Sequence, residues 1–330
     1  MVATCPVAEV YRRGVDETTD RSGLLLGTAA YLVWGFFPLY FARLAPTGAV
    51  EVIAHRVVWS LLFCVVALAA TRSLGTLRAV LRSRRMTAGL AAAGVLIATN
   101  WLVYVYGVLS GHTVDAALGY YINPLATVLL AVVVLGEKLR RAQWVALGIA
   151  AAAVVVITAG VGRFPWVAVV LAITFALYGL AKNRIGRTVG ALTGLTVETA
   201  TIAPLALVFF AWSGAQGTLD FGALGGWHTA ALVALGPITA VPLLLFGGAA
   251  RRLPLSVIGL LQYLTPTMQF LIAVLVFGEE MPAARWWGFA LVWLALVVMT
   301  TDGVRAGRAR QATVRRDQAA SSGRQATVNQ

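Results

Sequence analysis

Few ionisable residues lie in the long apolar runs of this sequence, and those few are candidates for chemistry. Glu51 and His55 are four residues apart in EVIAHRVVWS, so they share one face of a helix, and Arg56 follows them. Arginine can hold an anionic substrate through two parallel hydrogen bonds, and histidine can carry a proton near neutral pH. The alternative is that Arg56 extends to a polar boundary and that Glu51 is solvated.

A second set of candidates combines amides and a hydroxyl with aromatic rings. Rings stack on an amphipathic ligand and amides orient it, so these residues and Arg56 are expected to bind substrate. The alternative for the two asparagines is that they form hydrogen bonds between helices. The set comprises Asn100, Trp101, Tyr104, Tyr120, Tyr121, Asn123, Gln262, Tyr263 and Thr265.

Glu198 is a further carboxylate in an apolar run. It is a candidate proton carrier beside His55 and Glu51, and the alternative is an ion pair with Lys182 or Arg184. Motifs for other chemistry are absent: the sequence has no GxxxxGK[ST], HExxH, CxxC or GxSxG. With two cysteines and three histidines, the chain is expected to hold no metal and no cofactor, to use no ATP directly, and to have no catalytic residues.

The composition requires a membrane around these residues. Hydrophobic residues make up 59% of the 330 residues and charged residues 12%, whereas soluble chains are about a quarter charged. A helix needs roughly 20 apolar residues to span a bilayer. The sequence predicts an all-α integral membrane protein with ten spans, at about 23–42, 50–71, 86–110, 114–136, 142–161, 164–181, 191–212, 229–250, 253–278 and 285–301.

The basic residues test this topology independently. If the N-terminus is cytoplasmic, nearly all of the 26 Lys and Arg residues fall in cytoplasmic segments, as the positive-inside rule demands. The exceptions are Arg43, Arg56, Arg163 and Arg285. Both termini are therefore predicted to be cytoplasmic, and the net charge of +13 reflects topology rather than nucleic-acid binding.

The two ends of the chain differ from the spans between them. Residues 1–21 form a polar cytoplasmic tail without the apolar core of a cleaved signal peptide. Residues 303–330 are basic and polar, and we expect a disordered cytoplasmic tail that contacts anionic membrane lipid.

The chain also resembles itself. Residues 118–144 align without a gap with residues 260–286, and Pro124 aligns with Pro266. We expect one five-helix repeat at 22–161 and a second at 162–302. Because five is odd, the second repeat inserts with inverted orientation, which is typical of secondary transporters. Interruptions of paired helices mark the substrate site in such proteins, so both prolines are candidate helix breaks there; the alternative is that they only kink the helices.

Six segments carry a resemblance to a known family. They are AYLVWGFFPLYF (30–41), EVIAHRVVWS (51–60), NWLVYVYGV (100–108), LGYYINPL (118–125), ITAVPLLLF (238–246) and LLQYLTPT (260–267). Together they resemble RarD-type EamA-like permeases of the drug/metabolite transporter superfamily, over about residues 23–302. The resemblance implies ten helices in two EamA-like repeats, a bacterial inner membrane and transport of a small solute. RarD-type proteins are linked by name to chloramphenicol sensitivity.

These observations predict a secondary active transporter of a small organic metabolite or drug-like solute, working by alternating access as a monomer or a homodimer. Two alternatives remain open. One is a membrane sensor that binds a solute without moving it, and the other is a membrane enzyme acting on a lipid-linked substrate. Neither the substrate nor the direction of flux follows from the sequence.

Overall fold

The computed structural model of the protein describes residues 21–136, 139–185, 189–250, 252–253 and 255–328. All regular elements in these ranges are helices. The N-terminal tail predicted for 1–21 lies outside the described residues except for Arg21. The helices are α2 (Arg21–Gly35), α3 (Phe37–Ala42), α4 (Ala49–Ala70), α5 (Leu74–Arg82), α6 (Arg84–Leu109), α7 (Thr113–Leu135), α8 (Arg141–Val161), α9 (Trp166–Ile185), α10 (Ala191–Ala215), α11 (Gly226–Ala250), α12 (Leu255–Leu261), α13 (Leu264–Leu271), the π-helix η1 (Ile272–Val276) and α14 (Ala283–Val328).

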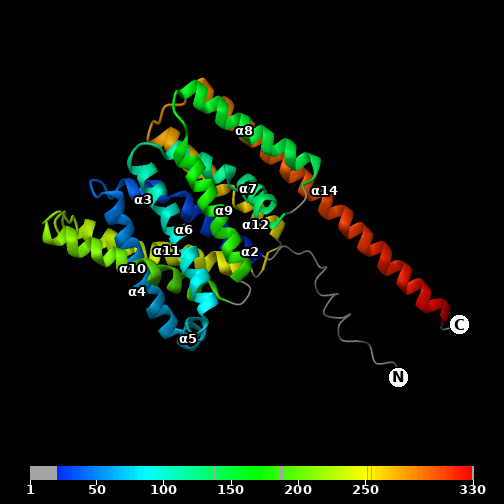
Figure 1. Ribbon diagram of the computed structural model, residues 1–330, viewed down its shortest axis with the longest axis horizontal. Helices are drawn as coiled ribbons and strands as arrows, with labels where there is room; N and C mark the ends of the chain where they lie inside the picture. The colour runs from blue at the N-terminus through cyan, green and yellow to red at the C-terminus, as the bar shows by residue number, and fades with distance from the viewer. Residues whose placement is uncertain (1–20, 137–138, 186–188, 251, 254, 329–330) are drawn as a thin grey trace. The chain divides into compact units, whose positions relative to one another are not determined.

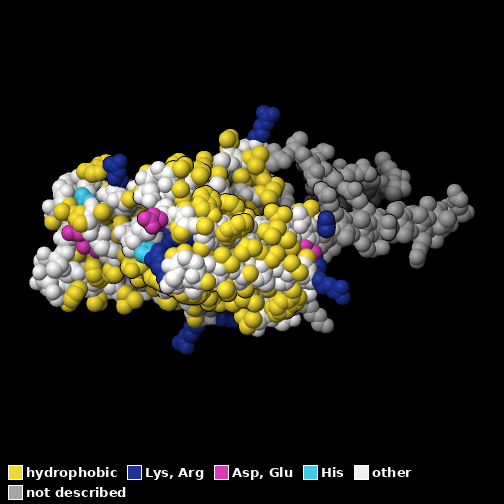
Figure 2. Space-filling model, turned by 90° about the horizontal axis from the view of Figure 1, so that it is seen from above, with side chains coloured by type: hydrophobic (Ala, Val, Ile, Leu, Met, Phe, Trp, Pro, Cys, Tyr) yellow, Lys and Arg dark blue, Asp and Glu magenta, His cyan; other side chains and the backbone are white. Residues whose placement is uncertain are grey.

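Nine helical segments of the described chain are long and apolar enough to cross a membrane. A further apolar helix, Trp166–Lys182, falls at the predicted sixth span but is shorter. The exposed surface fits a lipid environment, because large apolar side chains such as Leu62 and Val66 of α4 are about half exposed. Figure 2 shows hydrophobic side chains over much of the described surface in view, with charged side chains only at scattered points.

The chain divides into two compact units. Unit 1 contains 1–95 and 185–272, and unit 2 contains 96–184 and 273–330. Each unit therefore takes helices from both halves of the sequence, and its boundaries do not follow the predicted repeats at 22–161 and 162–302. The inverted relation of the two repeats stays a prediction.

Unit 1 is organised around α4 and α11. Helix α4 packs against α10 and α11, while α11 and α13 pack against α2. Every residue from Glu51 to Val57 is buried, and both α10 and α11 pack against α4. This arrangement places Glu51, His55 and Arg56 inside the unit.

Unit 2 contains a long antiparallel helix pair. Helix α8 lies alongside the first part of α14, and both also contact α7 (Figure 1). Ala146, Ala150 and Ala153 form the buried stripe of α8, and such small residues let two helices approach closely in a membrane.

Helices α7 and α14 differ from the sequence predictions, whereas the ninth span is interrupted near Pro266. Helix α7 continues through Pro124 without the predicted break, because a proline removes only one backbone hydrogen bond and membrane helices tolerate this loss. In the ninth span a two-residue turn separates α12 from α13, just before Pro266. Helix α14 continues to Val328, where disorder was expected from residue 303; alanine and arginine are frequent there and favour helix.

Candidate functional site

The structure distributes the predicted site residues over both units, and each set is described within its own unit. Unit 1 holds the charged candidates and the turn between α12 and α13. Unit 2 holds the asparagines and most of the aromatic candidates. The unit 1 set is Glu51, His55, Arg56, Glu198, Gln262, Tyr263, Thr265 and Pro266. The unit 2 set is Asn100, Trp101, Tyr104, Tyr120, Tyr121, Asn123 and Pro124.

Arg56 lies in the second turn of α4 and is only 4% exposed. Its Nε atom donates a hydrogen bond to the Oγ1 atom of Thr239 on α11, at 3.0 Å. Its guanidinium carbon lies 5.5 Å from the ring centre of Phe37 and 5.8 Å from that of Phe41, both on α3. We call Arg56, Phe37, Phe41 and Thr239 the Arg56 cluster. Aromatic faces attract a guanidinium, so three helices hold this charge inside a membrane span.

His55 is fixed as a neutral ring by its neighbours. The indole Nε1–H of Trp59 donates to Nδ1 of His55, at 3.1 Å. Because an indole nitrogen only donates, the ring proton of His55 must be on Nε2, which lies 3.6 Å from Oε1 of Glu51. The ring centres of Phe210 and Phe221 are 4.6 and 4.7 Å away. A second proton on His55 would break the bond to Trp59, so this conformation does not favour His55 as the proton carrier.

Glu51 holds the loop between α10 and α11. Its Oε1 atom accepts the backbone N–H groups of Asp220 and Phe221, both at 3.1 Å, and Oε2 lies 3.3 Å from the first of these nitrogens. Glu51 is 5% exposed. Glu51 is therefore a positioning residue of this loop rather than a solvated side chain.

We predict that Glu51→Ala loosens this loop. Charge-assisted hydrogen bonds contribute about 1.5–3 kcal/mol, so the amides of Asp220 and Phe221 should exchange with deuterium at least ~10-fold faster. Hydrogen-exchange mass spectrometry of peptides covering 216–225 measures this change. Glu280→Ala is the matched control, since Glu280 is exposed, and it should leave the exchange of these peptides unchanged.

Glu198 lies on α10 and is 2% exposed. Its backbone is in close contact with α6: a Cβ atom added to Gly94 would lie 2.7 Å from the carbonyl oxygen of Glu198. Glu198 is therefore deeply buried in unit 1, and its role as a proton carrier stays a prediction. Its pairing with Lys182 or Arg184 stays a prediction.

Thr265 ties the interrupted ninth span to α2. Its Oγ1 atom donates to the carbonyl oxygen of Tyr31 at 2.8 Å, so in this conformation it joins two helices. Gln262 and Tyr263 form the turn that precedes α13. One turn later, Gln269 donates to the carbonyl oxygen of Trp34 at 3.2 Å. The break in this helix is therefore supported by hydrogen bonds to α2.

Asn100 is saturated by partners within unit 2. Its Nδ2 atom donates to the carbonyl oxygen of Leu171 at 3.0 Å and to Oγ1 of Thr174 at 2.9 Å, both on α9. Its Oδ1 atom accepts the hydroxyl of Tyr120 on α7 at 3.2 Å. Asn100 is fully buried, so in this conformation it joins α6, α7 and α9 and has no open donor for a ligand.

The aromatic candidates of unit 2 contact different helices. Tyr104 and Tyr120 lie against each other, with ring centres 5.6 Å apart. Tyr121 instead contacts Phe289 and Trp293 of α14 edge-on. Trp101 is buried, with 9% of its surface exposed. Consecutive residues of α7 therefore serve different helix contacts.

Asn123 differs from Asn100 in its hydrogen bonding. Its Oδ1 atom is buried and accepts no hydrogen bond. Its main-chain carbonyl accepts the hydroxyl of Thr127 at 2.9 Å. An unsatisfied buried acceptor costs free energy unless a ligand or water supplies a donor. Unlike Asn100, Asn123 thus has a buried amide oxygen without a donor, and its contact with substrate stays a prediction.

Comparison with known proteins identifies the family. The model of the EamA-like transporter family matches residues 21–159. A protein named RarD from Streptomyces exfoliatus is 48% identical over 296 residues, which cover 90% of this chain and 93% of the relative. The chain belongs to the RarD group of the EamA-like transporter family. An uncharacterised transporter of Pseudomonas aeruginosa is 44% identical over 87% of this chain and 96% of its own length.

These relatives and the apolar helices make this RarD-group chain a multi-pass bacterial membrane transporter. A solved crystal structure of a protein 22% identical to the chain shares its fold. Its TM-score is 0.56, and the match covers 86% of this chain and 98% of that one.

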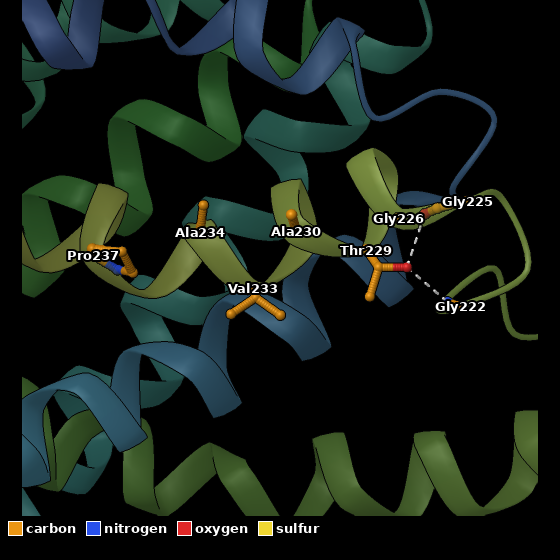
Figure 3. A pocket seen from close by; sticks show the side chains of 8 residues that line it. All are labelled: Gly222, Gly225, Gly226, Thr229, Ala230, Val233, Ala234 and Pro237. Atoms are coloured by element: carbon orange, nitrogen blue, oxygen red, sulfur yellow. Dashed lines mark hydrogen bonds between the residues drawn. The ribbon is translucent and has the colours of Figure 1, made fainter.

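One pocket of this RarD-group protein is lined by none of the predicted site residues. It has a volume of about 530 Å³ and follows one face of α11 and the loop before it, from Gly222 to Pro237. Figure 3 shows that its lining is small or apolar, except for Thr229, whose hydroxyl bonds to Gly222 and Gly225. This pocket offers a ligand little polar chemistry. Within the described residues, no three His, Cys, Asp or Glu side chains could hold a metal ion.

Sequence reasoning missed the aromatic and hydroxyl partners of Arg56. Thr239 is 183 positions away from Arg56 along the chain, and nothing local connects the two. Phe37 and Phe41 offer a weak signal, because their i,i+4 spacing places them on one helix face. In a RarD-group chain rich in apolar residues, such a pair is common.

Proposed function

We propose that the protein is a secondary active transporter of a small organic solute and that it works by alternating access of two inverted five-helix repeats. The family supports transport, and the internal sequence match supports the repeats. The observation that carries the proposal is Arg56. A charge near the bilayer centre costs at least about 2.5 kcal/mol on insertion scales, so such residues are retained for function.

The Arg56 cluster indicates what part of the substrate it binds. A guanidinium recognises a carboxylate in a bidentate manner, and the rings of Phe37 and Phe41 provide apolar contacts beside it. In unit 2, the open Oδ1 atom of Asn123 suits an N–H or O–H donor. From the Arg56 cluster alone we infer a solute that carries an anionic or strongly polar group on an apolar body.

The orientation follows from the charge pattern alone. With both termini in the cytoplasm of a bacterium and the chain in its inner membrane, the loops at Arg43, Arg163 and Arg285 face outward. Cysteines introduced at 43 and at 305 and labelled in intact cells would test this orientation. Only the former should react with an impermeant thiol reagent.

A flux assay tests the function directly. The purified protein in proteoliposomes should release a preloaded solute from a panel of amino acids, sugars, nucleosides, amphenicols and aromatic metabolites. A sensor would bind a solute without moving it, and an enzyme would convert a lipid-linked substrate. Binding without flux for every ligand that stabilises the protein would contradict the transporter proposal.

We further propose that Glu198 carries the coupling proton. Transport should then change with pH in the wild type, and Glu198→Gln should remove that dependence because the amide cannot titrate. His55→Gln should retain it, because Trp59 already holds His55 as a neutral ring. Initial rates at pH 6 and pH 8 measure both variants. An unchanged pH profile in Glu198→Gln would show that another group couples transport.

A further inference from the structure

Unit 2 contains a second pocket that none of the predicted site residues line. Its volume is about 340 Å³. Its walls come from three places in the chain: the end of α6, the connection between α8 and α9, and the segment that leads into α14. The lining residues are Gly111, Val161, Arg163, Glu279, Glu280, Pro282 and Arg285. We call it the Arg285 pocket.

Arg285 is buried in the first turn of α14, with 5% of its surface exposed. Its Nη1 atom donates to the carbonyl oxygen of Glu280 at 2.7 Å, and its Nη2 atom lies 3.5 Å from Oδ1 of Asp115. The Nε–H group is also buried and has no partner. Such a group requires an acceptor, because an unsatisfied buried donor costs free energy. A ligand in the pocket that Arg285 lines can supply that acceptor.

Arg163 provides the second cation of the pocket. Its Nη2 atom lies 3.8 Å from Oδ2 of Asp115, and about half of its side chain is exposed. It also donates through Nη1 to Nε2 of His112, whose Nδ1 atom is 3.0 Å from the hydroxyl of Ser110. Because arginine only donates, His112 is held as the neutral Nδ1–H tautomer. The guanidinium of Arg163 is thus fixed on one side and accessible on the other.

Two of the three carboxylates around the pocket already form ion pairs or hydrogen bonds with the protein, and the third does not. Asp115 lies between the two arginines. Glu279 accepts the backbone N–H groups of Thr113 and Val114, at 2.6 and 2.9 Å, at the start of α7. The carboxylate of Glu280 is exposed and forms no hydrogen bond or ion pair in the described structure.

We propose that the Arg285 pocket binds a small monocarboxylate. The ligand carboxylate would accept the buried Nε–H of Arg285 and a free N–H of Arg163, and its apolar end would lie toward Val161 and Pro282. Charge-assisted hydrogen bonds between arginine and a carboxylate are stronger than hydrogen bonds between neutral groups. The three neighbouring carboxylates repel any anion in proportion to its charge, so they disfavour doubly charged phosphate more than a singly charged monocarboxylate.

Titration calorimetry with benzoate tests the proposal. The titration uses the full-length protein in detergent at constant ionic strength, with inorganic phosphate and benzylammonium as comparison ligands. Benzoate should bind at millimolar concentration or tighter, whereas the two comparison ligands should not bind. Arg285→Lys and Arg163→Gln should each weaken benzoate binding at least ~10-fold, because each loses a charge-assisted hydrogen bond. A melting curve of each variant establishes that it is folded.

Two further variants separate this pocket from other sites. Arg43→Gln removes an exposed arginine that lies outside the pocket and should leave benzoate binding unchanged. Arg56→Gln removes the proposed substrate contact, which benzoate also fits, so the benzoate binding that remains in Arg56→Gln should belong to the Arg285 pocket and should be weakened by adding Arg285→Lys. The inference then stands or fails independently of the proposed substrate contact at Arg56. Loss of binding in Arg56→Gln with retention in Arg285→Lys would overturn the proposal. So would phosphate binding as strong as benzoate binding, or no benzoate binding at all.

Discussion

Replacing Arg56 by glutamine is expected to reduce transport by about 100-fold, the equivalent of roughly 2.7 kcal/mol of lost substrate binding in the transport cycle. The physical reason is that the proposed substrate anion loses a bidentate partner in a site of low dielectric constant. The initial rate of flux in proteoliposomes, for the best solute of the panel, measures the effect. Thr239→Val should cause a smaller loss, since it only removes the hydrogen bond that orients Nε.

Arg56→Lys is the informative intermediate in this series. It keeps the positive charge but lacks the planar fork, so we expect it to transport more slowly than the wild type and faster than Arg56→Gln. Arg43→Gln is the matched control and should transport at the wild-type rate, because Arg43 is exposed between α3 and α4. Transport at the wild-type rate by a folded Arg56→Gln protein would remove Arg56 from the substrate site.

Replacing Gly236 by alanine is expected to destabilise unit 1 strongly. A Cβ atom at Gly236 of α11 would lie 2.5 Å from the carbonyl oxygen of Trp59 and 2.7 Å from its carbonyl carbon on α4. These are backbone atoms, so the helices themselves would have to separate. Forcing extra methyl groups into tight packing costs typically about 1–3 kcal/mol, and more where the backbone must move. A lower melting temperature in detergent measures this loss.

Gly148→Ala provides the matched control for the packing prediction. Gly148 also lies within a helix, α8, but no atom lies within 4 Å of the Cβ position there. Alanine is favoured over glycine in a helix by up to about 1 kcal/mol, so the melting temperature of this variant should be unchanged or higher. Equal melting temperatures for the two variants would show that α4 and α11 are not in this close contact.

The sequence by itself predicted the membrane character, the family and most helices of this protein. Apolar runs long enough to span a bilayer stand out locally, and basic residues alternate between the loops. Because the apolar runs contain few charged residues, Arg56 and Glu198 stand out in the sequence, and both are buried in the structure. Among the residues that the structure describes, nine helical segments are long and apolar enough to span, and a shorter apolar helix lies at the predicted sixth position.

The roles of individual polar residues could not be predicted in this way. Asn100 and Asn123 are equivalent as sequence features, yet one amide is saturated by α7 and α9 and the other has an open oxygen. The alternative that Glu51 is solvated is wrong, because its carboxylate holds a loop about 170 positions away. These roles depend on hydrogen-bond partners that are distant along the chain, and no local sequence pattern predicts them.

The physical reason lies in the solvent of the protein. In water, a helix shows which face it buries, because its apolar stripe must avoid the solvent. In a bilayer, lipid and protein interior are equally apolar, so hydrophobicity marks where a helix spans but not which face meets another helix. The sequence therefore determined that the chain crosses the membrane many times and where its charges lie. Only the tertiary structure decided which helices surround Arg56, Asn123 and Arg285.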